Sequence, residues 1–292
     1  MKKIIALALA LALTLSLAAC GAPSNNNGGG SSNKGSSKGA PSSFEEIVAV
    51  DNDECAITIT GIDEDDFWGY ALKVTLENKS ADTTYMFSVT NASINGVECD
   101  PFFATDVAAG KIANDDITFS DSALEDNDIG DYTDIELTFK VYDSENWDAD
   151  PVALETVHVY PYGEDEATVY EREAQSSDKV ILDNDYATVI VTGCDEDDFW
   201  GYEVNLFVIN KSDANITVSA DEVSVNGYMT DPLYVSSVSA GKCAFSSMTW
   251  SDSDFEDNGI TDVEEIEFKL RVYDSDDWGA DDYANEVITL NP

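Results

Sequence analysis

The residues of this chain that are best suited to chemistry are acidic and aromatic, and they occur twice. Residues 63–70 read Asp-Glu-Asp-Asp-Phe-Trp-Gly-Tyr, and the same eight residues recur at 195–202. Adjacent carboxylates repel one another, and Ca²⁺ neutralises such clusters because it accepts about six to eight oxygen ligands in flexible geometry. A tryptophan beside carboxylates suits another ligand, since its ring can stack on a sugar while the acids accept hydroxyl hydrogen bonds.

The calcium hypothesis needs these turns to meet a second acidic connection. If the preceding strand is the first of a sandwich, they share one end with the Glu-Asp-Asn runs at 125–127 and 256–258. The candidate calcium ligands are then Asp63, Asp65, Asp66, Glu125, Asp126, Asp195, Asp197, Asp198, Glu256 and Asp257. The plainer interpretation is that these acids form a solvated surface, and the residue pattern leaves both open.

Tryptophans mark the same acidic turns. Trp68 and Trp200 lie at the junction of turn and strand, and Trp147 and Trp278 lie in a later acidic turn. They are candidates for stacking on a ligand, but a tryptophan more often closes the end of a sandwich core, and that structural role is favoured. Trp250 aligns with Phe119, which predicts core packing for both of them.

Signatures of catalysis are nearly missing from the sequence. His158 is the only histidine, and its counterpart in the second copy is Thr289, so a duplicated histidine site is excluded and a structural role is expected. No nucleophile elbow, phosphate-binding glycine loop or metalloprotease helix occurs. We therefore expect no enzyme. Paired carboxylates could serve a surface hydrolase, but acids are so abundant here that a pair carries no information.

A duplicated domain positions these turns. Asn-Lys-Ser at 78–80 returns at 210–212, and Val-Tyr-Asp-Ser at 141–144 returns at 272–275. The matches keep their order along both halves, which convergent composition would not do. The sequence predicts two copies, at 44–162 and 178–292, joined by an acidic linker at 163–177 that forms a loop or a short helix.

Within each copy, apolar residues alternate with polar ones. This period of two runs through residues 70–76 and 135–142 and through their counterparts in the second copy, and it predicts half-buried antiparallel strands. Asn95-Gly96 and Asn226-Gly227 predict hairpin turns that need positive φ. Several short strands per copy, without a long amphipathic helix, predict an all-β protein of two tandem β-sandwiches.

Three further motifs carry a resemblance. They are the strand ending at 76–80 (Leu-Glu-Asn-Lys-Ser), the Ala-Gly-Lys turn at 109–111, and the Leu-Glu-Asp-Asn connection at 124–127 that leads into the strand at 135–142. With these motifs the chain resembles the immunoglobulin-like domains of unknown function that occur, often in tandem, in secreted lipoproteins of Gram-positive bacteria. The resemblance covers residues 46–161 and 178–292 and implies two immunoglobulin-like sandwiches at the cell envelope. It supplies no catalytic residues.

The N-terminal residues predict export and lipidation. Lys2 and Lys3 precede an apolar run at 4–17, and Leu-Ala-Ala-Cys at 17–20 ends in a cysteine at the cleavage position. The alternatives are a membrane-spanning anchor or an ordinary signal, but the run has 14 residues where about 20 span a bilayer. We expect a lipoprotein signal peptide at 1–19, a lipidated Cys20, and a flexible Ser/Gly/Asn-rich linker at 20–43.

Charge narrows the range of partners. The formal net charge is −45, and removal of residues 1–19 takes away Lys2 and Lys3 and makes it −47. Such a surface repels nucleic acid and anionic headgroups, while 43% hydrophobic and 10% aromatic residues suffice for folded cores. The leading hypothesis is a monomeric, lipid-anchored, non-catalytic binding or structural module on the extracellular face of the cell membrane, with an unknown protein or glycan partner. The alternative is a calcium-dependent adhesion or sensing module.

Four cysteines follow Cys20. They are Cys55, Cys99, Cys194 and Cys243. Their counterparts in the other copy are Ala187, Thr230, Ile62 and Ile112. Because the copies share no cysteine position, buried free thiols are favoured over a disulfide framework. The pairs Cys55–Cys99 and Cys194–Cys243 stay open as alternatives.

Overall fold

The computed structural model describes residues 44–101, 103–119, 129–146, 148–197, 201–277 and 279–292, with the side chains of residues 196 and 197 left out. The described chain is nearly all β, with antiparallel sheets packed as sandwiches, which confirms the predicted all-β class. We call residues 44–162 repeat 1 and residues 178–292 repeat 2.

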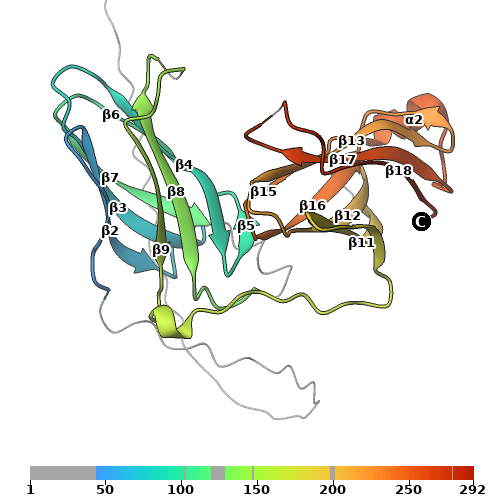
Figure 1. The fold of residues 1–292 in the computed structure, drawn as a ribbon, viewed down its shortest axis with the longest axis horizontal. Helices are drawn as coiled ribbons and strands as arrows, with labels where there is room; N and C mark the ends of the chain where they lie inside the picture. The colour runs from blue at the N-terminus through green and yellow to red at the C-terminus, as the bar shows by residue number, and fades with distance from the viewer. Residues whose placement is uncertain (1–43, 102, 120–128, 147, 198–200, 278) are drawn as a thin grey trace, which may run out of the picture. The chain divides into compact units, whose positions relative to one another are not determined.

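Repeat 1 contributes two layers (Figure 1). One sheet has the order β1-β2-β3-β7. Its strands are β1 (Ile47–Asp51), β2 (Cys55–Asp63), β3 (Tyr70–Asn78) and β7 (Ile112–Phe119). The facing layer has the order β5-β4-β8-β9, with β6 also paired to β4. Its strands are β4 (Tyr85–Ile94), β5 (Val97–Cys99), β6 (Ala104–Val107), β8 (Ile135–Asp143) and β9 (Ala153–Val159).

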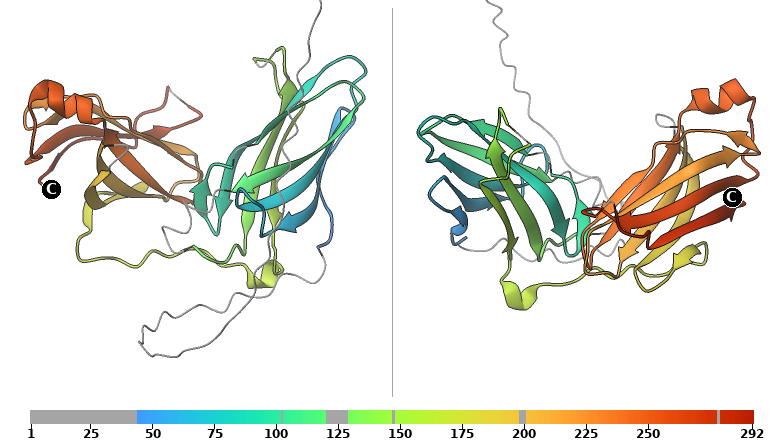
Figure 2. Two further views of the ribbon diagram at one scale, coloured as in Figure 1. Left: turned by 180° about the vertical axis from the view of Figure 1, so that it is seen from behind. Right: turned by 45° about the horizontal axis from the view of Figure 1, so that its top comes forward.

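Repeat 2 builds the same two layers from the equivalent residues (Figure 2). The strands of the first layer are β10 (Lys179–Asp183), β11 (Ala187–Asp197), β12 (Gly201–Asn210) and β16 (Cys243–Trp250). Those of the second are β13 (Ile216–Val225), β14 (Tyr228–Met229), β15 (Val235–Val238), β17 (Ile266–Asp274) and β18 (Ala284–Leu290). A 3₁₀ turn, η1 (Glu164–Glu166), lies in the segment between the repeats, and a short helix, α2 (Asp252–Asn258), follows β16.

The period-two pattern is confirmed by the side chains that face the cores. In β3, Leu72, Val74 and Leu76 are fully buried while Lys73 and Thr75 are half-buried. The same alternation runs through β8 and β17. Each burial removes apolar surface from water at about 25 cal/mol per Å², so the alternation fixes which face of each strand points inward.

The two Asn-Gly pairs form the predicted turns. Asn95 and Gly96 have φ of 53° and 83°, and Asn226 and Gly227 have φ of 51° and 80°. Positive φ at both central residues gives a turn whose twist matches that of the flanking strands. These turns connect β4 to β5 and β13 to β14 and so set the register of both hairpins.

The two repeats are joined through a strand edge. β16 of repeat 2 pairs in parallel with β5 of repeat 1, at Cys243 opposite Val97, so that one nine-stranded sheet runs through both repeats. Phe207 and Cys243 of repeat 2 also belong to the hydrophobic core of repeat 1. Edge pairing between the repeats was not predicted from the sequence.

Candidate functional site

The acidic turn between β2 and β3 is held by its own carboxylates. The Asp66 side chain accepts a hydrogen bond from the Trp68 backbone N–H at 3.0 Å, and the Asp63 side chain accepts one from the Asp65 N–H at 3.3 Å. The Gly69 N–H donates to the Asp66 carbonyl at 3.1 Å. Short polar side chains that bond their own backbone are typical of tight turns. The acids therefore shape the turn before any ligand arrives.

Lys73 supplies the positive charge for this turn. Its Nζ lies 2.8 Å from an oxygen of Asp116, 3.4 Å from Asp63 and 3.5 Å from Asp66. The hydrogen bond to Asp116 is the main cause that raises the pKa of Lys73. The ammonium lies among the carboxylates at the place where a cation would be expected.

Three of the predicted calcium ligands of repeat 1 lie in the described part of the chain. Asp63 and Asp66 share Lys73, while Asp65 is exposed. Glu125 and Asp126 lie outside the described residues. Within the part of the chain that the structure describes, no group of three or more histidine, cysteine, aspartate or glutamate side chains is placed to hold a metal ion.

Repeat 2 replaces the charge at the position of Lys73 by an amide. Asn205 donates to Asp195 at 3.0 Å, and its side-chain oxygen accepts from the Ser247 hydroxyl at 2.7 Å. The backbone of Asp197 ends β11, whereas its side chain and all of Asp198 lie outside the described set. Two further candidates, Glu256 and Asp257, are exposed on α2.

Of the four candidate stacking tryptophans, only Trp68 can be placed. Trp147, Trp200 and Trp278 lie outside the described residues. Trp68 is 75% exposed and Phe67 is 87% exposed, and their rings meet edge to face with centroids 4.8 Å apart. The expectation that this tryptophan closes the end of the core is wrong for Trp68, because its ring lies in solvent.

An open groove of about 700 Å³ lies beside the two exposed rings. Its lining combines aromatic and acidic side chains from the turn, from the segment before β6 and from β7 with small side chains of β6. The lining residues are Asp66, Phe67, Trp68, Asp100, Phe103, Ala104, Thr105, Asp115, Asp116 and Thr118. We call it the acidic-aromatic groove.

Its acidic wall is ordered by short contacts. The Thr105 hydroxyl of β6 donates to the Asp115 carboxylate of β7, and the second oxygen of Asp115 accepts the Asp116 N–H at 2.9 Å. Asp115 and Asp116 are both half-buried. The wall therefore presents fixed acceptors rather than mobile surface carboxylates.

Sequence reasoning missed most of this wall. Asp115 and Asp116 belong to no recognisable motif, Asp100 belongs only to the repeated Asp-Pro pair, and Phe67 was not predicted although it lies in the repeated eight residues. One signal was present, because Asp115 and Asp116 stand where repeat 2 has Ser246 and Ser247. Acids that occur in only one copy point to a property of that copy.

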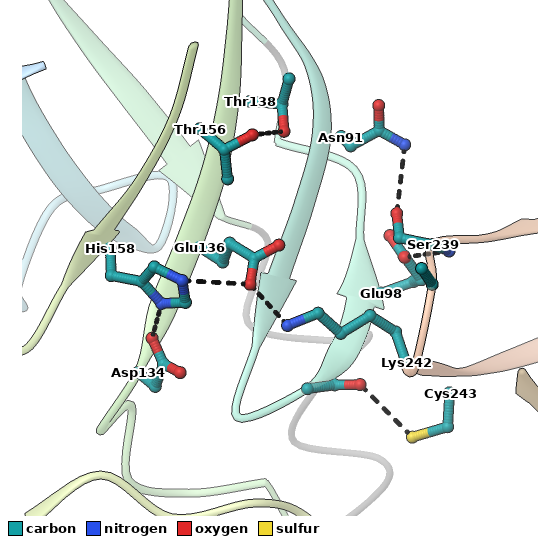
Figure 3. A network of polar contacts seen from close by, with 12 residues as sticks. Asn91, Glu98, Asp134, Glu136, Thr138, Thr156, His158, Ser239, Lys242 and Cys243 are labelled. Atoms are coloured by element: carbon teal, nitrogen blue, oxygen red, sulfur yellow. Dashed lines mark hydrogen bonds and ion pairs between the residues drawn. The ribbon is translucent and has the colours of Figure 1, made fainter. Parts of the chain in front are cut away.

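The contacts of His158 fit a structural role. His158 Nδ1 lies 2.7 Å from Asp134 and its Nε2 lies 3.3 Å from Glu136 (Figure 3). Its ring also stacks on Tyr160 at 5.4 Å. No serine or cysteine nucleophile is hydrogen-bonded to this imidazole among the described residues.

The four cysteines are free thiols, as favoured by the copy comparison. Cys55 and Cys243 are buried, and burial raises the pKa of each thiol to about 11. Cys99 and Cys194 are half-buried, and burial raises their pKa as well. The alternative pairs Cys55–Cys99 and Cys194–Cys243 are therefore wrong, and the raised pKa values make these thiols poor nucleophiles.

Comparison with known proteins assigns this chain to no family. A search with protein-family models and a search of curated proteins found no match to this chain. In the described part of the chain, no helix is long and apolar enough to cross a membrane.

Proposed function

We propose that this protein is a non-catalytic binding module of the cell envelope that holds a saccharide in its acidic-aromatic groove. The single observation that carries the proposal is the exposure of Phe67 and Trp68 beside ordered carboxylates. Exposed aromatic pairs are costly in water, and soluble proteins expose large apolar groups together mainly where something binds. The signal peptide expected at 1–19, followed directly by Cys20, supports a lipid anchor and the extracellular face of the membrane.

The chemistry of the groove selects the class of saccharide. Aromatic faces pack against the C–H face of a sugar ring, and carboxylates accept its hydroxyl hydrogens. Among the described residues, the carboxylates of Asp66, Asp100, Asp115 and Asp116 outnumber the ammonium of Lys73, so the local charge is negative. The whole surface is strongly acidic as well. The ligand is therefore a neutral or amine-bearing saccharide rather than an anionic one.

The scaffold supports the same proposal. The orders β2-β3-β7 and β5-β4-β8-β9 are those of an immunoglobulin-like sandwich, in which loops at the ends of the sheets carry binding residues. We infer an immunoglobulin-like fold for both repeats from this order and from the sequence motifs. The calcium-dependent alternative has less support, because Lys73 lies among the carboxylates that would have to bind the ion.

The test is a titration of the chain carrying Cys20→Ser, which keeps it free of lipid, with soluble oligosaccharides. The probes are oligomers of N-acetylglucosamine, of glucosamine and of glucose, followed by tryptophan fluorescence and calorimetry. We expect binding by at least one neutral or amine-bearing series. Trp68→Ala should lower the affinity by about 30-fold, since a stacked anchor contributes about 2 kcal/mol.

Tyr186→Ala is the matched control, because Tyr186 is 45% exposed on repeat 2 and stacks on Tyr283 away from the groove. This variant should bind as the unaltered chain does. Binding that is equally weakened by Trp68→Ala and Tyr186→Ala, or binding of anionic sugars alone, would contradict the groove as the site.

A further inference from the structure

The contact between the repeats is asymmetric, because each repeat uses a different strand edge. Since the domain is duplicated, a second copy of each of these edges remains unused in the chain. The contact joins one edge of the β5 layer in repeat 1 to one edge of the β16 layer in repeat 2. The Cys243 N–H donates to the Gly96 carbonyl at 3.0 Å. Val97 and Cys243, which face each other, are only 1% and 8% exposed.

Polar contacts lie beside this edge pair (Figure 3). Lys242 Nζ lies 2.6 Å from Glu136, and the Ser239 N–H donates to Glu98 at 2.6 Å. Burial raises the pKa of Glu98. Asn91 donates to the Ser239 hydroxyl at 3.2 Å. The junction thus has an apolar centre, a salt bridge and a hydrogen-bonded rim, which are the parts of a specific interface.

Because the domain is duplicated, each repeat carries the equivalents of both surfaces. The counterpart of β5 is β14, which ends its sheet in repeat 2, and the counterpart of β16 is β7, which ends its sheet in repeat 1. At the position of Val97 stands Tyr228, 52% exposed, and at the position of Cys243 stands Ile112, 63% exposed. Met229 beside Tyr228 is 66% exposed. The two residues that pair in the junction are buried, and their two counterparts, Tyr228 and Ile112, are exposed apolar side chains.

One ion pair of the junction is also duplicated, whereas Glu98 is replaced by Met229 in repeat 2. Lys111 of repeat 1 stands where repeat 2 has Lys242, and Glu267 of repeat 2 stands where repeat 1 has Glu136. Both Lys111 and Glu267 are exposed. Neither forms an ion pair with another described residue, whereas Lys242 and Glu136 pair with each other.

From this equivalence we propose that a second copy of the chain docks head to tail, with its β7 edge at Ile112 against the β14 edge at Tyr228. Lys111 of one copy then pairs with Glu267 of the other, as Lys242 pairs with Glu136 within the chain. Such a contact is heterologous, so it leaves one edge open at each end and generates open chains of copies. It replaces the monomer expected from the sequence, and it does not rest on the proposed saccharide function.

The contact between copies is weaker than the contact within one chain. In repeat 2 the edge is extended by Phe207 and Phe245, which pack on Tyr170 of the connecting segment. Repeat 1 has Thr75 and Asn114 at those positions, and they bond to each other at 2.8 Å. We expect a dissociation constant on the order of 0.1–1 mM, in the range of small transient interfaces. A shared membrane anchor raises the local concentration of copies toward this value.

The decisive experiment is site-specific crosslinking of the Cys20→Ser chain. Ile112→Cys and Tyr228→Cys are made separately and mixed under mild oxidation at physiological salt, which screens the repulsion between acidic copies. Facing residues on paired strands lie within disulfide reach, so the mixture should give a disulfide-linked dimer that neither variant gives alone. Val180→Cys is the matched control, because Val180 is 60% exposed on β10 and is not part of either edge.

Sedimentation with charge exchange gives a second, independent readout. Lys111→Glu and Glu267→Lys should each abolish the concentration-dependent association, and the doubly exchanged chain should restore it. A chain that stays monomeric up to about 1 mM would overturn the proposal. So would a dimer formed by Tyr228→Cys alone, which indicates a symmetric contact, or crosslinking of Val180→Cys as efficient as that of Tyr228→Cys.

Discussion

At the scale of single residues, Lys73 determines what the acidic turn can bind. Its ammonium is within 3.5 Å of three carboxylates, and in repeat 2 the same position holds Asn205, with Ser247 in place of Asp116. The two copies thus offset the negative charge of the acidic turn in different ways. One neutralises the acids with a charge, and the other lowers the number of acids and uses an amide.

This arrangement predicts how the turn responds to calcium. Thermal melts of the unaltered chain should coincide in Ca²⁺, in Mg²⁺ and in EDTA at matched ionic strength. Lys73→Met leaves Asp63, Asp66 and Asp116 without their cation, and Ca²⁺ at 100 times its dissociation constant should then stabilise the variant by about 2.7 kcal/mol. Lys79→Met is the control, because it removes a lysine that pairs with Asp51 and bonds the Asn52 carbonyl but does not contact the acidic turn. A rise in the melting temperature of the unaltered chain in Ca²⁺ alone would instead favour the calcium-dependent alternative.

A second pair of residues forms a hydrogen bond in the core of repeat 2, and both of its members are replaced in repeat 1. Trp250 is fully buried, and its indole N–H donates to the Thr230 hydroxyl at 2.9 Å. Repeat 1 has Phe119 and Cys99 at these positions. The donor and its acceptor are therefore both present in one copy and both replaced in the other.

The pair predicts a measurable coupling. Thr230→Val removes the acceptor and leaves a buried N–H without a partner, so it should lower the free energy of unfolding by about 1–3 kcal/mol. In a Trp250→Phe background the same change should cost little, because no donor is left. A double-mutant cycle in urea measures the coupling, and additive effects of the two substitutions would show that the hydrogen bond contributes nothing.

At the scale of elements, the turns decide how the strands meet, and two glycines test this directly. A Cβ on Gly201, which has φ of 93°, would lie 2.3 Å from the Trp250 carbonyl oxygen. A Cβ on Gly227, which has φ of 80°, would meet nothing within 4 Å. Both positions need positive φ, but only the first lies against the backbone of β16.

Gly227→Ala should therefore lower the free energy of unfolding by about 1 kcal/mol, the cost of positive φ in a residue with a Cβ. Gly201→Ala adds a clash with backbone that cannot rotate away, and it should cost about 3 kcal/mol or more. Urea unfolding of both variants gives the comparison. Equal losses would mean that the strand ends of β12 and β16 can separate without cost.

At the scale of the whole molecule, the shared sheet couples the two repeats. Cys243 packs into the core of repeat 1 although it starts a strand of repeat 2, while the core of repeat 2 does not include it. A domain pair linked only by its connecting segment would unfold in two independent steps. A pair that shares a strand edge and buried side chains unfolds together.

Calorimetry of the unaltered chain should therefore show one transition. Cys243→Asp places a carboxylate in the buried contact and should split the trace into two transitions separated by several degrees. Ile112→Asp, at the equivalent and exposed position of repeat 1, should keep one transition. Two transitions in the unaltered chain would mean that the contact at Val97 contributes little to stability.

The sequence by itself determined the elements of this protein. Strand alternation, the turns at Asn95-Gly96 and Asn226-Gly227, and the buried roles of Phe119 and Trp250 were predicted and are confirmed. These features depend on neighbours one or two residues apart or on the burial of one side chain, and a single sequence contains both kinds of information.

Only the tertiary structure decided where those elements meet. It brought Asp66 of one turn beside Asp116 of β7, placed Lys73 between them, exposed Trp68, and joined Val97 to Cys243. Each of these contacts links residues that lie far apart along the chain or depends on which sheet edge is left open. The energies that choose among such contacts are sums over many packed side chains, so no local pattern in the sequence specifies them.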